Sequence, residues 1–343
     1  MDNMKRRVRT CAEFGQLRLL REDIQTELHG RLLLSDTEEW LHNVNRMHDA
    51  IIIRTIEIAE NMLEAAGHGT PPVPYAFLLL GSGGRREQTL WSDQDNGLVY
   101  ADGGDGRADD YFSKLTKLID QGLREAGYPP CEGGVTASGE LWRKPIGRWN
   151  EMIGDWFKEG TWESVRYLLI MADVRCVYGD DALVREIRQV FRRGVGETPG
   201  ILPGMLNNTL RHKVVLGPLG NLIKERYGED AGGFDIKYGA YIPMVNAIRL
   251  LSIRHGIDAT PTMERIDRLI PFVGGERAEA WKSAFRTILK FRALAPYRLE
   301  DGFYTTKGKL RAADLTKEVA SQLKACLHVG EQLQKYIKKI MQP

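Results

Sequence analysis

A buried strand that ends in a glycine-rich segment is the feature that most constrains the fold of this chain. Residues 75–80 form an apolar run that follows a proline-rich stretch and leads directly into Gly-Ser-Gly-Gly at residues 81–84. A short apolar run between prolines and glycines is typical of a strand and not of a helix. A second strand is expected from Gln94 to Tyr100. The sequence therefore predicts a sheet whose first strand delivers its carboxyl end to a glycine loop.

The residue types in this loop indicate a site for an anion. Gly81 and Gly84 can adopt backbone angles that are closed to other residues, and such loops expose N–H groups. A helix expected to begin at Arg85 and to reach Leu90 would direct its positive end to the same space. The Ser82 hydroxyl and the Arg85 guanidinium are further donors for phosphate oxygens. These residues predict a phosphate-binding loop.

Two aspartates follow the loop at a spacing of two residues. In a strand, Asp93 and Asp95 direct their carboxylates to the same face, where the two charges repel each other. A divalent cation relieves that repulsion. Hard oxygen ligands together with phosphate suit Mg²⁺, with Mn²⁺ as the alternative ion. The expected ligand is therefore a metal-loaded nucleotide.

Each of these pieces has a simpler interpretation when it stands alone. A glycine run is usually a plain turn, and Asp-x-Asp near a strand end is usually part of a solvated turn. The ordered combination is more specific. It differs from a Walker loop because no Gly-Lys-Ser/Thr follows, and from a dinucleotide fingerprint because the Gly-x-Gly-x-x-Gly spacing is absent.

The ordered motif resembles the signature of the DNA polymerase beta-like nucleotidyltransferases. The matching pattern is Gly-Ser-x-Gly-Arg-x-Glu at residues 81–87, followed by Ser-Asp-x-Asp at residues 92–95. The resemblance is to the branch that contains protein-PII uridylyltransferase and glutamine synthetase adenylyltransferase, and within it to a narrower group assigned to signal transduction. Members of that group carry a helical C-terminal substrate-binding domain and often CBS modules. Further similar segments lie at residues 127–135, 141–143, 173–180, 235–239 and 262–265.

This resemblance implies a reaction and assigns residues to it. An acceptor hydroxyl attacks the α-phosphorus of a nucleoside triphosphate, so that the acceptor becomes nucleotidylated and pyrophosphate leaves. Gly81 and Ser82 would hold the triphosphate, with Arg85 beside the leaving pyrophosphate. Asp93 and Asp95 would bind the metal.

A third carboxylate is the element for which this sequence departs from the wider superfamily, whose active members use it to take the proton of the acceptor hydroxyl. The corresponding stretch, residues 132–137, offers Glu132 as its only acid. Glu132 is therefore the candidate base, and a solvated loop glutamate is the alternative interpretation. Asp173 is a further acid in a similar segment, which we interpret as a structural pair with Arg175.

Two more residues are interpreted through the resemblance. Lys237 lies in an Asp-x-Lys-x-Gly segment similar to one in the adenylyltransferase and uridylyltransferase relatives, where a lysine neutralises phosphate charge during transfer. A solvated lysine is the alternative. Glu87 is expected to orient the loop and not to bind the metal.

Length and charge limit the class of protein. With 343 residues, 43% of them hydrophobic and 27% charged, the chain can bury large cores and form about two or three domains. The formal net charge of +2 lacks the basic excess of a phosphate-backbone binder, so we expect no nucleic-acid partner.

The cysteines and the apolar segments indicate the compartment. Four cysteines are scattered without paired spacing, which favours neither a zinc site nor a disulfide framework and fits a reducing cytoplasm. No apolar stretch approaches the roughly 18 residues that span a bilayer, so we expect no membrane partner.

The order of the expected elements divides the chain into three parts. Residues 1–70 are expected to be a helical arm, residues 71–199 the nucleotidyltransferase-like domain and residues 200–343 a helical substrate-binding bundle. Few strands among many helices, the third strand being expected at 134–137, indicate an α+β fold with a small mixed sheet. Further helices are expected at residues 109–126, 145–169, 180–193, 207–227, 234–255, 262–269, 276–293 and 315–341.

The helical arm carries its own signals. Ser35 to Glu38 reads as a capping box, and an apolar stripe recurs every three or four positions from Leu41 to Met62. Such a stripe faces either a core or a partner, which leaves a homo-oligomer through these helices open.

Three classes of function remain open on the sequence alone. The first is transfer of a nucleotide from a triphosphate, with ATP as one candidate, to a protein or small-molecule acceptor. The second is a nucleotide-binding signalling module that has weak or no catalysis and acts through a protein partner. The third is a helical interaction scaffold in which the loop is vestigial.

Overall fold

The computed structural model of the chain describes residues 2–103, 106–209, 214, 216–217 and 221–341. These residues form two compact units. Unit 1 runs to Asp155 and also takes residues 173–191 and 299–305. Unit 2 takes residues 156–172, 192–298 and 306 onward.

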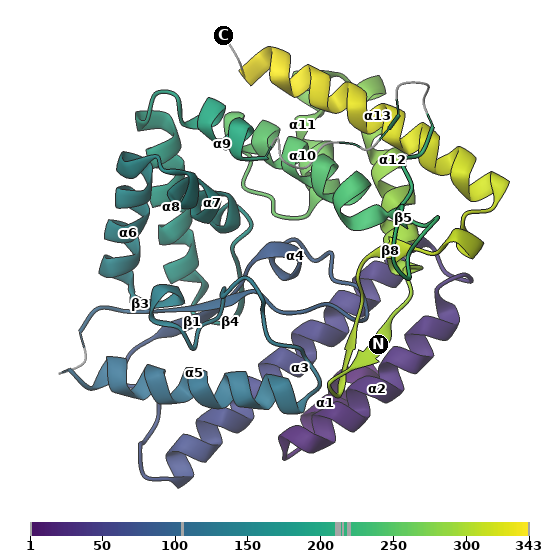
Figure 1. The fold of residues 1–343 in the computed structure, drawn as a ribbon. Coiled ribbons are helices and arrows are strands. Elements are labelled where there is room, and N and C mark those ends of the chain that lie inside the picture. Colours follow the sequence, from purple (N-terminus) through teal and green to yellow (C-terminus); the bar gives the residue numbers. More distant parts are fainter. Residues whose placement is uncertain (1, 104–105, 210–213, 215, 218–220, 342–343) are drawn as a thin grey trace. The chain divides into compact units, whose positions relative to one another are not determined.

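The sheet of unit 1 has the strand order β3-β2-β1-β4. Strand β1 (Tyr75–Leu79) pairs antiparallel with β2 (Asn96–Tyr100) on one side and with β4 (Arg175–Gly179) on the other, while β3 (Arg143–Pro145) runs parallel to β2. Every residue of β1 and β2 is buried, which explains the apolar run of β1 and the apolar end of β2 from Leu98 to Tyr100. The small mixed sheet and the α+β class are confirmed (Figure 1).

The glycine segment itself is helical. Gly81–Gly84 form the single turn α4, directly after β1, and the helix expected at residues 85–90 is absent from this segment. The reason lies at Arg86, whose φ of 56° is left-handed and ends a helix. The Arg86 N–H then donates to the Gly83 carbonyl, so the turn closes on itself. We call residues 81–84 the glycine turn.

The third strand is not where the sequence indicated it. Residues 134–137 are irregular, and the strand that pairs with β2 is β3, after the short 3-10 helix Glu140–Trp142. The predicted segment nevertheless lies beside β2. The Val135 carbonyl accepts from Asn96 N–H at 3.0 Å and the Asn96 side chain accepts from Ala137 N–H at 2.8 Å, so this segment lies beside the start of β2. The adjacent glycines allow it to bend in place of pairing.

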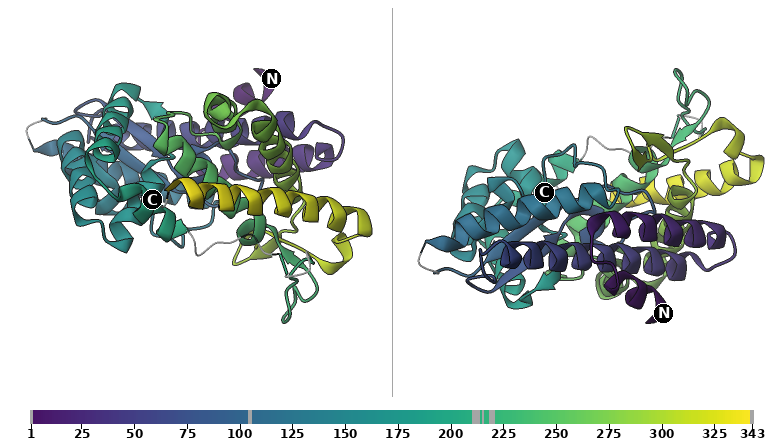
Figure 2. Two further views of the ribbon diagram at one scale, coloured as in Figure 1. Left: turned by 90° about the horizontal axis from the view of Figure 1, so that it is seen from above. Right: turned by 90° about the horizontal axis from the view of Figure 1, so that it is seen from below.

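The helices of the N-terminal arm are part of unit 1 and pack against its other elements. Helix α3 (Thr37–Ala65) contacts α1 (Asp2–Arg9), α2 (Phe14–Arg31), α5 (Arg107–Glu125) and β4. Figure 2 shows α2, α3 and α5 side by side. The N-cap of α3 is Asp36, which accepts from the N–H groups of the first turn, and not the expected Ser35.

Two helices and one hairpin connect distant parts of the chain. Helices α6 (Ile146–Glu159) and α8 (Asp181–Glu197) each begin in unit 1 and end in unit 2. Strands β6 (Arg298–Glu300) and β7 (Phe303–Thr305) form a two-stranded sheet that the sequence did not indicate. Residues 299–305 of this hairpin belong to unit 1.

Unit 2 is a helical bundle with a two-stranded ribbon. Its helix α10 (Ile242–Arg254) packs against other helices of the unit and has Pro243 in its first turn, where proline is tolerated. Tyr241 stacks on Phe285 at a centroid distance of 5.9 Å within the core. The other elements are α7 (Trp162–Met171), α9 (Ile201–Thr209), β5 (Phe234–Asp235), the π-helical turn Lys237–Tyr241, α11 (Thr262–Val273), α12 (Gly275–Ala293), β8 (Lys309–Leu310), the 3-10 helix Ala312–Asp314 and α13 (Lys317–Met341).

One expected helix of unit 2 is largely absent. The prediction covered residues 207–227, whereas α9 ends at Thr209 and residues 221–227 are irregular. Residues 210–213, 215 and 218–220 lie outside the described residues. Among the helices that the structure describes, none combines the length and the apolar character needed to cross a bilayer.

Candidate functional site

The glycine turn brings the first two predicted site residues against one of the acids. Gly81 has a φ of 52°, and a Cβ at this position would overlap the Asp95 carboxylate oxygen Oδ2. Glycine is therefore required twice here, by its backbone angle and by the approach of the acid. Gly81 and the adjacent Ser82 are half-buried and so remain partly accessible. The structure thus brings Gly81 and Asp95 together, with Ser82 adjacent in the chain, and their roles at a nucleotide and a metal stay predictions.

Gly84 has a different reason to be glycine. A Cβ at Gly84 would overlap the backbone carbonyl oxygen of Asp173, which precedes β4. Backbone cannot yield as the end of a side chain can, so this residue fixes the distance between the glycine turn and the segment before β4. Gly84 is buried and acts by close packing. Its predicted contact with a nucleotide stays a prediction.

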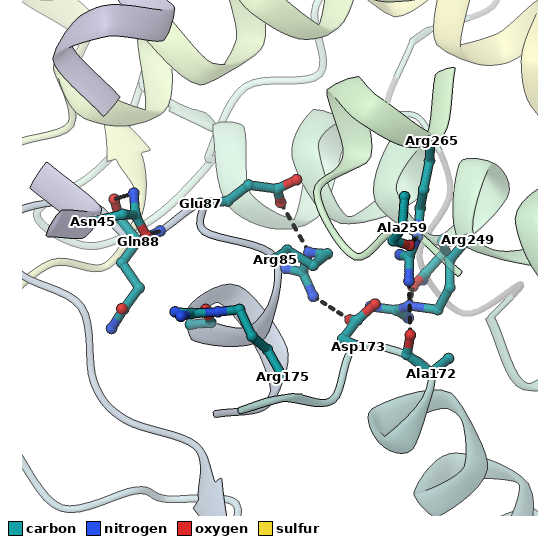
Figure 3. A network of polar contacts seen from close by, with 12 residues as sticks. Asn45, Arg85, Glu87, Gln88, Ala172, Asp173, Arg175, Arg249, Ala259 and Arg265 are labelled. Carbon is teal, nitrogen blue, oxygen red and sulfur yellow. Dashed lines mark hydrogen bonds and ion pairs between the residues drawn. The ribbon is translucent and has the colours of Figure 1, made fainter. Parts of the chain in front are cut away.

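The Arg85 side chain forms ion pairs with two carboxylates of the protein. Its guanidinium lies 2.8 Å from Glu87 Oε2 and 2.5 Å from Asp173 Oδ2, and all three side chains are at most 4% exposed (Figure 3). Such a buried group positions the glycine turn from within, which favours a structural role for Arg85 over the predicted contact with phosphate. Glu87 orients this segment through Arg85, as expected.

A second arginine supports the turn from β4. Arg175 donates to the Gly83 carbonyl, with Nη2 at 2.9 Å, and forms a two-pronged ion pair with Asp49 of α3 at 3.0 and 2.8 Å. The expected pair of Asp173 with Arg175 is therefore wrong in its partners, although both residues are structural. Each of the two arginines joins the turn to a carboxylate on a distant part of the chain.

The backbone after the turn is held by α3 and by the end of α5. Asn45 of α3 both accepts from Gln88 N–H at 3.0 Å and donates to the Gln88 carbonyl at 3.3 Å. His48, fully buried, bonds the Thr89 carbonyl at 2.9 Å and the Tyr128 hydroxyl at 2.8 Å. Burial, followed by the charge of Arg21, lowers the pKa of His48 to about 3, so the ring is neutral and donates to the carbonyl.

The two acids lie on one side of the segment that leads into β2. From Trp91 to Asn96 the odd-numbered side chains are half-buried and the even-numbered ones are buried. Because burial alternates along this segment, Asp93 and Asp95 share the accessible side. The segment precedes β2, which begins only at Asn96, so the acids stand at the edge of the sheet and not within it.

A cysteine contacts the second acid. The Cys131 thiol donates to Asp95 Oδ1 at 3.1 Å, while Oδ2 of the same carboxylate lies against Gly81. Burial, and then the charge of Asp95, raises the pKa of Cys131 to about 12. The thiol therefore keeps its proton and acts as a donor. Glu132, the predicted base, is the next residue and is exposed in a turn.

Lys237 lies in unit 2, where it begins the π-helical turn Lys237–Tyr241. Its N–H donates to the Gly308 carbonyl at 3.1 Å, and its ammonium lies 5.4 Å from the Tyr238 ring centroid. The neighbouring Asp235 accepts from Tyr238 N–H at 2.7 Å and caps this turn. The predicted role of Lys237 at a phosphate stays a prediction.

Comparison with known families supplies the assignment. A family described as "Putative nucleotidyltransferase DUF294" matches residues 28–163. A second, described as "Putative nucleotidyltransferase substrate binding domain", matches residues 199–341. The chain belongs to this nucleotidyltransferase family. No curated protein matches the chain.

The candidate site has donors of the right kind for a divalent cation. Asp93 and Asp95 are carboxylates on one accessible side, and hard oxygen ligands suit Mg²⁺. The protonated Cys131 thiol is not a ligand of that kind. Among the described residues, no cluster of three or more His, Cys, Asp or Glu side chains is arranged to hold a metal. The residues present therefore fit an ion that takes its remaining ligands from phosphate and water.

Several residues of this site gave no signal that sequence reasoning could use. The Arg85 to Asp173 pair spans 88 positions and the Cys131 to Asp95 bond spans 36 positions, so no local pattern contains them. The one available hint was that Cys131 and Asp173 both lie in segments that resemble the family.

Proposed function

We propose that this chain transfers a nucleoside monophosphate from a triphosphate to a hydroxyl of a protein or small-molecule acceptor, in an Mg²⁺-dependent reaction of the uridylyltransferase and adenylyltransferase type. The observation that supports it is the contact of Asp95 with Gly81, which places an acid directly against the glycine turn at the end of β1. Asp93 lies on the same accessible side. Phosphate and metal ligands thus meet at one point of unit 1.

The roles of the residues follow from their exposure. Ser82 and the backbone of Gly81 bind the triphosphate, while Asp93 and Asp95 hold the Mg²⁺. The ion, when bound, neutralises the charge that develops on the phosphate oxygens. Arg85 holds the glycine turn in place and is not assigned to phosphate binding. Lys237 of unit 2 remains the proposed residue for neutralising phosphate charge.

The base is the element that decides between two functions. Glu132 is the proposed acceptor of the hydroxyl proton, because it follows the residue that contacts Asp95. Cys131, which contacts Asp95, carries a thiol and not a carboxylate, and its raised pKa makes it unsuitable as a base at neutral pH. This observation favours, as the second candidate, a nucleotide-binding signalling module that acts through a protein partner.

The setting of this activity rests on the sequence. We propose the cytoplasm as its location, supported by four free cysteines, and a three-part organisation at residues 1–70, 71–199 and 200–343. A homo-oligomer through the N-terminal helices remains an open proposal.

Calorimetry on a double variant tests the proposed site. Asp93→Asn with Asp95→Asn should weaken binding of Mg·ATP and Mg·UTP by at least about 100-fold, roughly 2.7 kcal/mol, because both metal ligands lose their charge. The matched control is Asp110→Asn with Asp120→Asn on the surface of α5. Binding by the first variant that equals binding by the control contradicts the proposal.

An adduct search then separates the two candidate functions. The protein is incubated with α-labelled triphosphates and a lysate of its source. Label on an acceptor together with released pyrophosphate supports transfer. Tight Mg·nucleotide binding without any adduct supports the signalling module.

A further inference from the structure

An aromatic pair lies beside the two acids of unit 1. The Trp91 and Tyr304 rings have a centroid distance of 5.0 Å and an interplanar angle of 45°. Both residues are half-buried, so neither is sealed in the core. Trp91 is two residues before Asp93 and four before Asp95.

Trp91 lies in the turn at Leu90 and Trp91, directly before the segment of the acids, and it is half-buried like Asp93 and Asp95. Consecutive Cα atoms are about 3.8 Å apart, so the Cα atom of Trp91 lies at most about 7.6 Å from that of Asp93 in any backbone conformation. The indole is therefore close to the carboxylates. A base linked through its ribose to the phosphates lies within this range of the metal.

The hairpin holds the indole from the other direction. Tyr304 belongs to β7, and the loop of the hairpin is tied to α2 because Arg18 Nη2 donates to the Gly302 carbonyl at 2.7 Å. Aromatic pairs at this distance stabilise each other and restrict the ring orientation. Tyr304 thus keeps Trp91 in place although it is more than 200 positions away in the sequence.

We infer that Trp91 is the stacking surface for the nucleobase of the bound triphosphate and that Tyr304 positions it. This inference rests on the proposed function and adds the base subsite to it. Aromatic side chains bind bases through their faces, and such stacking accepts every base because each has a π-face. A purine covers more of an indole than a pyrimidine does, so the subsite favours ATP or GTP over UTP or CTP.

The test compares a ligand that has a base with one that lacks it. Calorimetry measures Mg·ATP and Mg·tripolyphosphate binding to wild type, Trp91→Ala, Trp91→Phe and Trp162→Ala. The last variant is the control, since Trp162 is a half-exposed tryptophan of α7 in unit 2. Trp91→Ala should bind Mg·ATP about tenfold more weakly than wild type and Mg·tripolyphosphate equally well. Trp91→Phe should retain most of the affinity.

Tyr304 is tested as a positioning residue. Tyr304→Phe keeps the ring contact and should bind Mg·ATP as wild type does, whereas Tyr304→Ala should lose affinity for Mg·ATP but not for Mg·tripolyphosphate. Rescue by the ring alone distinguishes positioning from a contact made by the hydroxyl.

Each failure has a distinct meaning. Unchanged Mg·ATP binding by Trp91→Ala, or equal losses for both ligands, overturns the base subsite while the phosphate and metal site stands. Absence of binding of either ligand to the wild type overturns the proposed function, and the base subsite with it.

Discussion

The two sides of the candidate site are built differently. The glycine turn and residues 85–89 are held by buried ion pairs and by hydrogen bonds from α3 and from the segment around β4, and most of their side chains are inaccessible. The acid side, residues 91–95, has half-buried residues at alternate positions, and the thiol of Cys131 donates a hydrogen bond to Asp95.

The difference teaches how the site divides its work. A buried charged group that loses its partner is energetically unfavourable. A network of buried ion pairs therefore stabilises one arrangement of the glycine turn over others. The acids must exchange water for metal and phosphate, which requires access. A rigid glycine turn and accessible acids suit a site in which a fixed backbone binds a ligand that enters from solvent.

The largest effect should come from breaking the rigid side. Asp173→Ala leaves the Arg85 guanidinium buried without its 2.5 Å partner, and removal of one member of a buried pair costs about 3–5 kcal/mol. Urea unfolding followed by circular dichroism measures this loss. Glu151→Ala is the control, since it breaks an exposed pair with Arg148 that is worth about 0.2–1 kcal/mol. Equal unfolding midpoints for the two variants would show that the buried pair does not hold the turn.

An intermediate effect is expected from pH, again on the rigid side. Because burial holds the pKa of His48 at about 3 in the folded protein, against roughly 6.5 when unfolded, the unfolded chain takes up a proton between these values. The contribution of His48 to the free energy of unfolding is fully present above about pH 6.5. It falls as the pH drops toward 3, by at most about 1.4 kcal/mol per pH unit.

The His48→Gln variant isolates this contribution. Glutamine can still donate to the Thr89 carbonyl but does not titrate, so its free energy of unfolding should decline less steeply between pH 6.5 and pH 4.5 than that of wild type. Urea unfolding at four pH values provides the comparison. Parallel pH profiles of the two proteins would remove His48 as a source of acid sensitivity.

The smallest effect belongs to the accessible side. Cys131→Ala removes the thiol donor that orients Asp95, and a hydrogen bond contributes about 0.5–1.5 kcal/mol, so Mg·ATP affinity should fall by about two- to tenfold. Cys131→Ser keeps a donor and should stay near wild type. Cys176→Ala is the control, because this thiol of β4 donates to the backbone of its own strand. Equal affinities for the alanine and serine variants would show that the thiol does not position the acid.

The sequence predicted the parts of this molecule whose signals are local. Strand β1 was readable because it is a continuous apolar run, and α3 because its apolar residues recur at helical spacing. Strand β2 was readable from its apolar end, Leu98 to Tyr100. The antiparallel pairing of the two strands, which brings Asp95 to Gly81, has no local signal and was not predicted.

The sequence did not predict features that depend on distant partners. The helix expected at 85–90 fails at Arg86, whose left-handed backbone is set by the closing of the glycine turn. The sequence predicted that Arg85 binds phosphate, because an arginine beside glycines usually contacts an anion. In the structure, Arg85 contacts the carboxylate of Asp173, which lies far along the chain. Strand β4, which completes the sheet, was missed because only part of its surface is buried.

The hairpin at residues 299–305 makes the two family segments inseparable. By sequence it lies within the stretch matched by the C-terminal family, yet in space it is part of unit 1. A fragment cut between the two matched regions would leave Trp91 without its aromatic neighbour and the carbonyl of Gly302 without its arginine. Unit 1 is therefore complete only when both matched segments are present in the same chain.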